Sequence, residues 1–140
     1  MVMLKILIVE DDHEMREFLQ DVADMLGYVC EAAATGHEAV AMAREQRPAL
    51  VIQDIMLPDM DGWSVAEQIR ACDGCERVPV IYCSGSVRAR EAYHAGPPPV
   101  SAFLYKPFDI DDLEKGLGAF IGSGKKPSNK CSGPWAGMFI

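Results

Sequence analysis

Acidic, hydroxyl and amine side chains stand where several apolar runs of this sequence end. The residues concerned are Glu10, Asp11, Asp12, Asp54, Ser84 and Lys106. Carboxylates are hard oxygen ligands that suit a magnesium ion, which uses one or two of them and keeps several waters. A cation and a lysine beside a carboxylate would in turn attract another anion, such as a phosphoryl group. The sequence therefore raises the possibility of phosphoryl chemistry, provided that the fold brings these residues together.

Each of these residues also has an ordinary structural explanation when taken alone. Asp12 is suited to cap the N-terminus of a helix. A single Ser84 is typical of a turn, and a single Lys106 is usually solvated. Asp54 is harder to explain, because an unpaired ionised carboxylate is costly to bury and this one directly follows an apolar run. The functional interpretation depends on the positions of the elements that carry the residues.

Strands and helices alternate along the chain. Apolar, continuous runs predict strands over residues 4–10, 28–33, 49–53, 78–84 and 101–105. Helical spacing of apolar residues, or a capping residue at the start, predicts helices over about 12–26, 35–46, 64–71, 88–95 and 109–121. This alternation indicates an α/β fold with a five-stranded parallel sheet and helices on both faces.

A flavodoxin-like strand order, 2-1-3-4-5, is a favoured arrangement for such a chain. Ligands of these folds bind outside the carboxyl ends of the strands, where the strand order reverses. One rim of the sheet would then carry residues 10–12, Asp54, Ser84 and Lys106. Three carboxylates there would repel one another and raise at least one pKa, and a bound divalent cation would remove the conflict.

Composition narrows the classes of partner. The chain of 140 residues is 49% hydrophobic and has a formal net charge of −8. This acidic balance argues against direct nucleic-acid binding and against an anionic membrane surface. No apolar run approaches the length of a membrane span, and the first residues do not form a signal peptide. Five cysteines without a framework pattern fit a reducing, cytoplasmic setting.

The motifs "ILIVEDD", "DIMLPDMDGW", "SGS" and "LYKPF" resemble the receiver domain of bacterial two-component response regulators. The resemblance runs from about residue 4 to 121 and implies a (βα)5 receiver fold. It implies that Asp54 accepts a phosphoryl group from a sensor histidine kinase or a histidine phosphotransfer protein. It also implies a Mg²⁺ site made by Asp11, Asp54 and the backbone carbonyl of Met56, with Glu10 acting through water.

The same resemblance assigns the remaining positions. Lys106 would pair with the phosphoryl oxygens, and the hydroxyl of Ser84 would turn toward them. Phe103 corresponds to the aromatic switch position, so phosphorylation would alter partner binding on the face formed by the fourth helix, the fifth strand and the last helix. Such a protein is a phosphoacceptor that assists its own phosphorylation and dephosphorylation. It is not an enzyme acting on a separate substrate.

The segment "GPPPV", residues 96–100, departs from the pattern of the family. Proline clashes with a preceding helical turn and pushes the residue before it out of helical geometry. The fourth helix should therefore end by about Ala95, with an extended segment over residues 97–99. A helix of roughly two turns is marginal on its own, so we expect it to be short and mobile or displaced. The polar Gln53 has no explanation at this level.

Two other classes of function compete with the phosphoacceptor. One is a receiver-like interaction domain that phosphorylation does not regulate. The other is a flavodoxin-like redox protein that uses Cys72 and Cys75, although this pair is expected at the opposite rim from the acids. Residues 122–140 have the composition of a flexible C-terminal tail. The cognate kinase, the output partner, homodimer formation, and whether the chain stands alone or belongs to a larger protein are left open.

Overall fold

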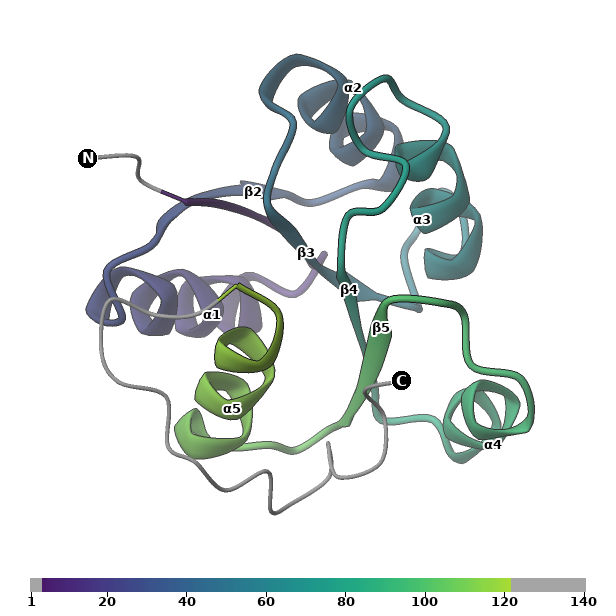
Figure 1. The fold of residues 1–140 in the computed structure, drawn as a ribbon. Helices are drawn as coiled ribbons and strands as arrows, with labels where there is room; N and C mark the ends of the chain where they lie inside the picture. The colour runs from purple at the N-terminus through teal and green to yellow at the C-terminus, as the bar shows by residue number, and fades with distance from the viewer. Residues whose placement is uncertain (1–3, 122–140) are drawn as a thin grey trace.

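Five parallel strands form one sheet with helices on both faces in the computed structural model, which describes residues 4–121 (Figure 1). The strands are β1 (Lys5–Val9), β2 (Val29–Ala33), β3 (Leu50–Asp54), β4 (Val80–Ser84) and β5 (Ser101–Tyr105). The helices are α1 (His13–Met25), α2 (Gly36–Gln46), α3 (Gly62–Arg70), α4 (Val87–Ala95) and α5 (Ile110–Ile121). The segment expected to be a flexible tail lies outside the described residues.

The order of the strands is β2-β1-β3-β4-β5, and every neighbouring pair is parallel. This confirms the predicted fold class and strand order. In this order β1 and β3 are neighbours at the centre of the sheet, with Val9 opposite Gln53. The chain therefore places the residues that follow β1 next to those that end β3.

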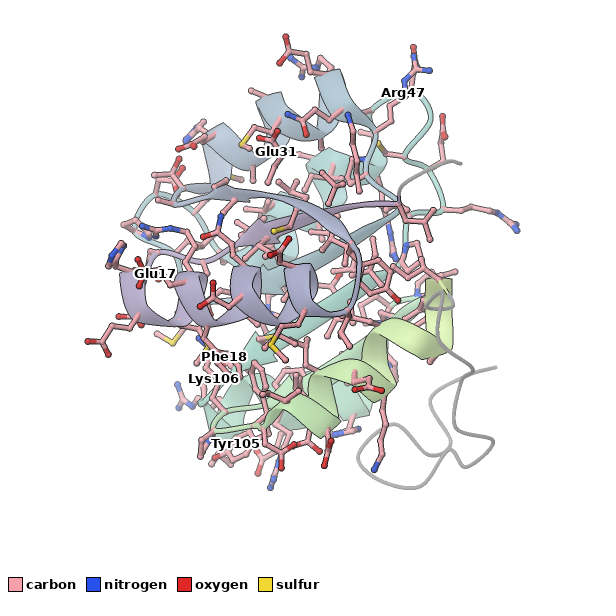
Figure 2. The ribbon with its side chains drawn as sticks, turned by 90° about the vertical axis from the view of Figure 1, so that its left-hand side faces the viewer. Glu17, Phe18, Glu31, Arg47, Tyr105 and Lys106 are labelled. Carbon is pink, nitrogen blue, oxygen red and sulfur yellow. The ribbon has the colours of Figure 1, made fainter. Side chains whose placement is uncertain are left out.

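The continuous apolar runs are explained by burial on both faces of the sheet. Along β1, Ile6 and Ile8 face the core under α1 and α5, whereas Leu7 and Val9 face the core under α2 and α3. Figure 1 shows α1 and α5 on one side of the sheet and α2 and α3 on the other. Figure 2 turns the α1 side toward the viewer, where Phe18 lies between α1 and α5. Burying both faces fixes the strands tightly and leaves the loops at their ends to carry function.

Two predicted boundaries are wrong by two residues, and the structure shows why. The third helix was expected from Ser64, but α3 begins at Gly62 because Asp61 is its N-cap and accepts a hydrogen bond from the Ser64 amide at 2.9 Å. The fourth strand was expected from Val78, but β4 begins at Val80. The carbonyl of Val78 instead accepts hydrogen bonds from the guanidinium of Arg70 at 2.9 and 3.2 Å.

Helix α4 has the predicted length. It ends at Ala95, and Gly96 follows with non-helical backbone angles. Among its residues only Ala89 and Tyr93 are buried. The Tyr93 hydroxyl makes a 3.0 Å hydrogen bond with the hydroxyl of Ser101 on β5. The early end of the helix is thus confirmed, and its mobility stays a prediction.

Candidate functional site

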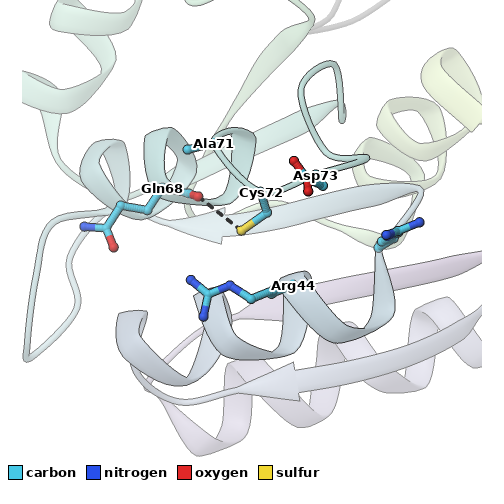
Figure 3. A pocket seen from close by; sticks show the side chains of 6 residues that line it. Arg44, Gln68, Ala71, Cys72 and Asp73 are labelled. Atoms are coloured by element: carbon cyan, nitrogen blue, oxygen red, sulfur yellow. Dashed lines mark hydrogen bonds between the residues drawn. The ribbon is translucent and has the colours of Figure 1, made fainter.

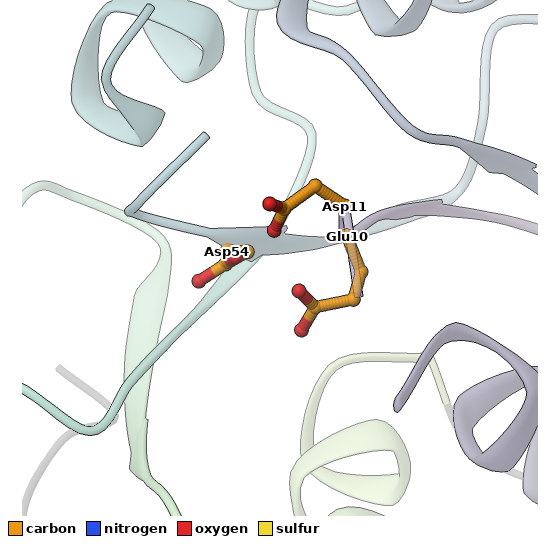
Figure 4. A group of neighbouring side chains, drawn as sticks. All are labelled: Glu10, Asp11 and Asp54. Carbon is orange, nitrogen blue, oxygen red and sulfur yellow. The ribbon is translucent and has the colours of Figure 1, made fainter. Parts of the chain in front are cut away.

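The carboxyl ends of β1 and β3 bring three carboxylates together. Glu10 and Asp11 directly follow β1, and Asp54 is the last residue of β3. One carboxylate oxygen from each of the three lies within 4.8 Å of the others (Figure 4). Figure 4 shows Glu10 and Asp11 reaching toward Asp54 from the neighbouring segment. Within residues 4–121, these three acids are the side chains whose possible ligand atoms lie close enough together to share a metal ion.

Lys106 supplies a positive charge that offsets the cost of burying the carboxylates of Glu10 and Asp54. Glu10 is 1% exposed and Asp54 is 5% exposed, whereas Asp11 is exposed. The Lys106 ammonium lies 2.7 Å from Glu10 Oε1 and 3.5 Å from Asp54 Oδ1. Burial alone would lower the pKa of Lys106, but the hydrogen bond to Glu10 and the nearby carboxylates raise it overall. The lysine therefore stays protonated between the two buried acids.

Asp54 still feels the repulsion of Glu10, because Lys106 offsets it only in part. Its pKa is raised from 3.8 to about 7, first by burial and then by the hydrogen bond and the charge of Glu10. The charge of Lys106 and the amide of Met56 oppose this rise without cancelling it. The site therefore holds more negative charge than one lysine neutralises near neutral pH. A cation bound there would replace the proton on Asp54.

The donor set fits magnesium. The carboxylates offer hard oxygen ligands, and Asp11 is open to solvent, which leaves room for the waters that Mg²⁺ keeps. Met56 follows two residues after Asp54, and its amide donates a 3.4 Å hydrogen bond to Asp54 Oδ1. This contact brings the Met56 backbone beside the acids, and the role of its carbonyl as a ligand stays a prediction.

Ser84 lies on β4, which is next to β3, and Phe103 lies on β5, which is next to β4. Ser84 is buried at the end of β4, where its hydroxyl oxygen accepts a 3.0 Å hydrogen bond from the Ser86 amide. Phe103 is buried on β5, with ring centroids 5.4 Å from Tyr93 and 6.3 Å from His94 of α4. Phe103 thus links β5 to α4, and a switching role for either residue stays a prediction.

Comparison with known families settles the class of this domain. Residues 6–117 match the model of the response regulator receiver domain. The chain belongs to the response regulator receiver family. The chain is 30% identical over 110 residues to the transcriptional regulatory protein HprR of Escherichia coli, a match covering 79% of this chain and 48% of that protein. It thus spans about half the length of several curated relatives.

Other relatives match over most of their length. Sporulation initiation phosphotransferase F of Bacillus subtilis is 30% identical over 118 residues, which is 84% of this chain and 93% of that protein. Among solved structures, the receiver domain of the sensor histidine kinase PA1611 from Pseudomonas aeruginosa has a TM-score of 0.77 and 30% identity. The match covers 87% of this chain and 100% of that one, and that structure holds a magnesium ion in its active site cleft. The Vibrio cholerae chemotaxis protein CheY4 has a TM-score of 0.75 and 27% identity, covering 86% and 100%.

Two residues of this receiver domain that sequence patterns did not indicate support the acids. Arg16 of α1 donates to the carbonyls of Glu10 and Asp11 at 3.0 and 3.2 Å, and so holds the turn that presents both acids. Gln53 donates from its amide nitrogen to the Asp54 carbonyl at 2.8 Å, while its own amide oxygen is buried without a hydrogen-bond partner. None of these three contacts has a sequence signal, because all three acceptors are backbone carbonyls.

Cys72 and Cys75 lie away from the acids of the receiver domain, beyond the C-terminal end of α3. Both are buried free thiols. The Cys72 thiol donates to the carbonyl of Gln68, as Figure 3 shows, and the Cys75 thiol donates to the carbonyl of Ala43. Burial also raises the pKa of Cys75, which disfavours the reactive thiolate. The pair has the features of packed structural cysteines.

Proposed function

We propose that this receiver domain accepts a phosphoryl group on Asp54 from the phosphohistidine of a sensor histidine kinase or a histidine phosphotransfer protein. The observation that carries the proposal is the difference between the three carboxylates. Both oxygens of Glu10 have partners, since Oε1 contacts Lys106 at 2.7 Å and Oε2 accepts from the Asp12 amide at 3.3 Å. Asp11 is exposed. Asp54 is buried beside the lysine, and its Oδ1 lies 3.4 Å from the Met56 amide and 3.5 Å from the Lys106 ammonium, so its contact with the lysine is longer than that of Glu10.

The proposed transfer begins with attack by a carboxylate oxygen of Asp54 on the phosphorus of the donor. The phosphorus–nitrogen bond then breaks, and its electron pair stays on the imidazole of the donor histidine. Bound Mg²⁺, held by Asp11, Asp54 and the Met56 carbonyl with Glu10 acting through water, would neutralise charge on the phosphoryl oxygens. Lys106 supplies a fixed positive charge for the same oxygens.

The response to phosphorylation would pass through Ser84 and Phe103. The Ser84 hydroxyl accepts from the Ser86 amide, so its proton can be donated to a phosphoryl oxygen. Turning toward that oxygen would pull on the loop that enters α4. Phe103 contacts α4 and would follow its movement, which would change the face formed by α4, β5 and α5. A local change of charge would thus bias a mobile element.

Residues 1–121 form the receiver domain in this proposal, and residues 122–140 are a tail. The protein acts in the cytoplasm, with Mg²⁺ as cofactor, as a phosphoacceptor that assists its own phosphorylation and dephosphorylation rather than turning over a separate substrate. In residues 4–121 no helix combines the length and apolar character that a membrane crossing requires. Direct nucleic-acid binding is not expected from the net charge of −8.

Intact-mass measurement after incubation with Mg²⁺ and acetyl phosphate tests the proposal. The wild type should gain the mass of one phosphoryl group, and Asp54→Asn should gain none while keeping the melting behaviour of a folded protein. Asp11→Ala should slow the labelling because it weakens the cation site. Full labelling of Asp54→Asn at the wild-type rate would refute the assignment of Asp54. A folded wild type that gains no mass would favour the interaction domain that phosphorylation does not regulate.

A further inference from the structure

The loop of residues 55–61 follows the proposed phosphoacceptor and carries Met56. Both ends of this loop are tied together. The Gly62 amide donates to the Ile55 carbonyl at 2.8 Å, and Met56 pairs with Asp61 in an isolated antiparallel bridge. These bonds close the base of the loop, so its orientation against the site depends on what holds its tip.

Asp59 at the tip of the loop is bonded to the beginning of α2. Its Oδ1 accepts from the Gly36 amide at 2.8 Å, and its Oδ2 accepts from the His37 amide at 3.0 Å. The His37 ring nitrogen Nδ1 lies 2.5 Å from the same Oδ2. These partners stand 22 and 23 positions away in the sequence. One carboxylate thus joins the loop after β3 to a separate helix.

These bonds complete the capping of α2. The first amides of a helix have no partner within it. Thr35, the N-cap, accepts from the Glu38 amide at 3.2 Å, and Asp59 takes the two amides before it. The Gly36 and His37 amides hold the pKa of Asp59 at about 2, well below its ordinary value. The carboxylate is therefore ionised across the neutral range, where a helix N-terminus favours it.

Packing also fits the loop closely to α2. A Cβ atom on Gly36 would lie 2.4 Å from Met60 Cγ and 2.7 Å from Val65 Cγ2. A residue with a side chain at position 36 would therefore have to displace the side chains of Met60 and Val65. Two successive loop side chains, Asp59 and Met60, thus rest on the first turn of α2.

We propose that Asp59 is a positioning residue for the cation site. By fixing the loop on α2, its carboxylate holds the Met56 backbone beside Asp54 before a cation arrives. Without this bond the loop would have to be ordered when the cation binds, and that entropy would be subtracted from the affinity. This inference rests on the proposed function, because it assigns a role within the same site. It predicts that Asp59 acts on Mg²⁺ binding although it contacts neither the acids nor the lysine.

A magnesium titration of the full chain separates this role from helix capping. Trp63 lies beside the loop and can report on it by fluorescence once Trp135 is changed to phenylalanine in every variant. Asp59→Ala should raise the Mg²⁺ concentration at half-saturation by about tenfold, the lower end of what losing an outer-shell partner costs a metal site. At saturating Mg²⁺, labelling by acetyl phosphate should return to the wild-type rate.

Thr35→Ala is the matched control, because it removes a cap from the same turn of α2 and leaves Asp59 in place. It should lower the melting temperature without shifting the Mg²⁺ midpoint. Asp59→Asn keeps one acceptor oxygen, should fold if the alanine variant does not, and should give an intermediate midpoint.

Two outcomes would overturn the role of Asp59 alone. In one, every folded Asp59 variant has the wild-type midpoint. In the other, Thr35→Ala shifts the midpoint as much as the Asp59 variants do. A wild type that neither binds Mg²⁺ nor accepts a phosphoryl group would instead overturn the proposed function.

Discussion

Removing the charge of Asp54 should stabilise the protein, and the gain should depend on pH. The folded protein raises the pKa of Asp54 from 3.8 to about 7, mainly through burial. Between these two values the folded protein keeps a proton that the unfolded chain releases. Its stability must therefore fall as the pH rises through this window, and the loss is complete above the folded pKa. Asp54→Asn is nearly isosteric and carries no charge, so it escapes the loss.

The size of the effect follows from the two pKa values. A pKa difference of about 3 corresponds to about 4 kcal/mol of unfolding free energy. This figure already includes the attraction of Lys106, which lowers the pKa of Asp54. The variant should therefore gain up to about 4 kcal/mol over the wild type near pH 8 and almost nothing near pH 4.

Urea unfolding in the presence of a chelator, at several pH values between about 4 and about 8, measures this gain directly. Glu17→Gln is the matched control, because its carboxylate is 62% exposed and should show little gain at any pH. The reasoning would be refuted if the advantage of Asp54→Asn were the same at both ends of the pH range. It would also be refuted if the variant were less stable than the wild type near pH 8.

Two further predictions concern the cation and helix α4. Mg²⁺ at ten times its dissociation constant should stabilise the wild type by about 1.4 kcal/mol. Asp11→Ala should lose most of this gain, and equal rises of the melting temperature in both proteins would show that the metal binds elsewhere. Amide hydrogen exchange should be faster in α4 than in α1, because α4 buries only Ala89 and Tyr93, and equal protection without phosphorylation would contradict the expected mobility.

The fold was predictable because β1, β3, β4 and β5 are buried along almost their whole length, which produces continuous apolar runs that stand out in the sequence, whereas the edge strand β2 is only partly buried. Helix boundaries were less certain. The third helix was predicted from Ser64, and the structure shows that Asp61 caps α3, which begins at Gly62. The same residue types serve turns and helix caps, so composition could not separate the two. The early end of α4 was predictable, because proline acts on the backbone through its own covalent structure.

The grouping of Glu10, Asp11, Asp54 and Lys106 was also predictable in outline. Each stands at the carboxyl end of a strand, and a parallel sheet gathers these ends on one rim. The structure adds the distances that distinguish the acids from one another. Lys106 lies closer to Glu10 than to Asp54, by 2.7 against 3.5 Å. Sequence order alone gives no reason for this preference, which leaves Asp54 with the looser contact that an acceptor needs.

Several contacts that the sequence did not reveal share one physical property, since each joins a side chain to a backbone atom. Arg16 donates to the carbonyls of Glu10 and Asp11, Gln53 to that of Asp54, and Arg70 to those of Val78 and Val100, while Asp59 accepts from the amides of Gly36 and His37. Sequence motifs consist of side-chain types, and every residue except proline offers the same backbone donor and acceptor. A partner of this kind leaves no trace at its own position. The residues that orient this site are therefore found only from coordinates, although the residues proposed to carry out its chemistry can be recognised in the sequence.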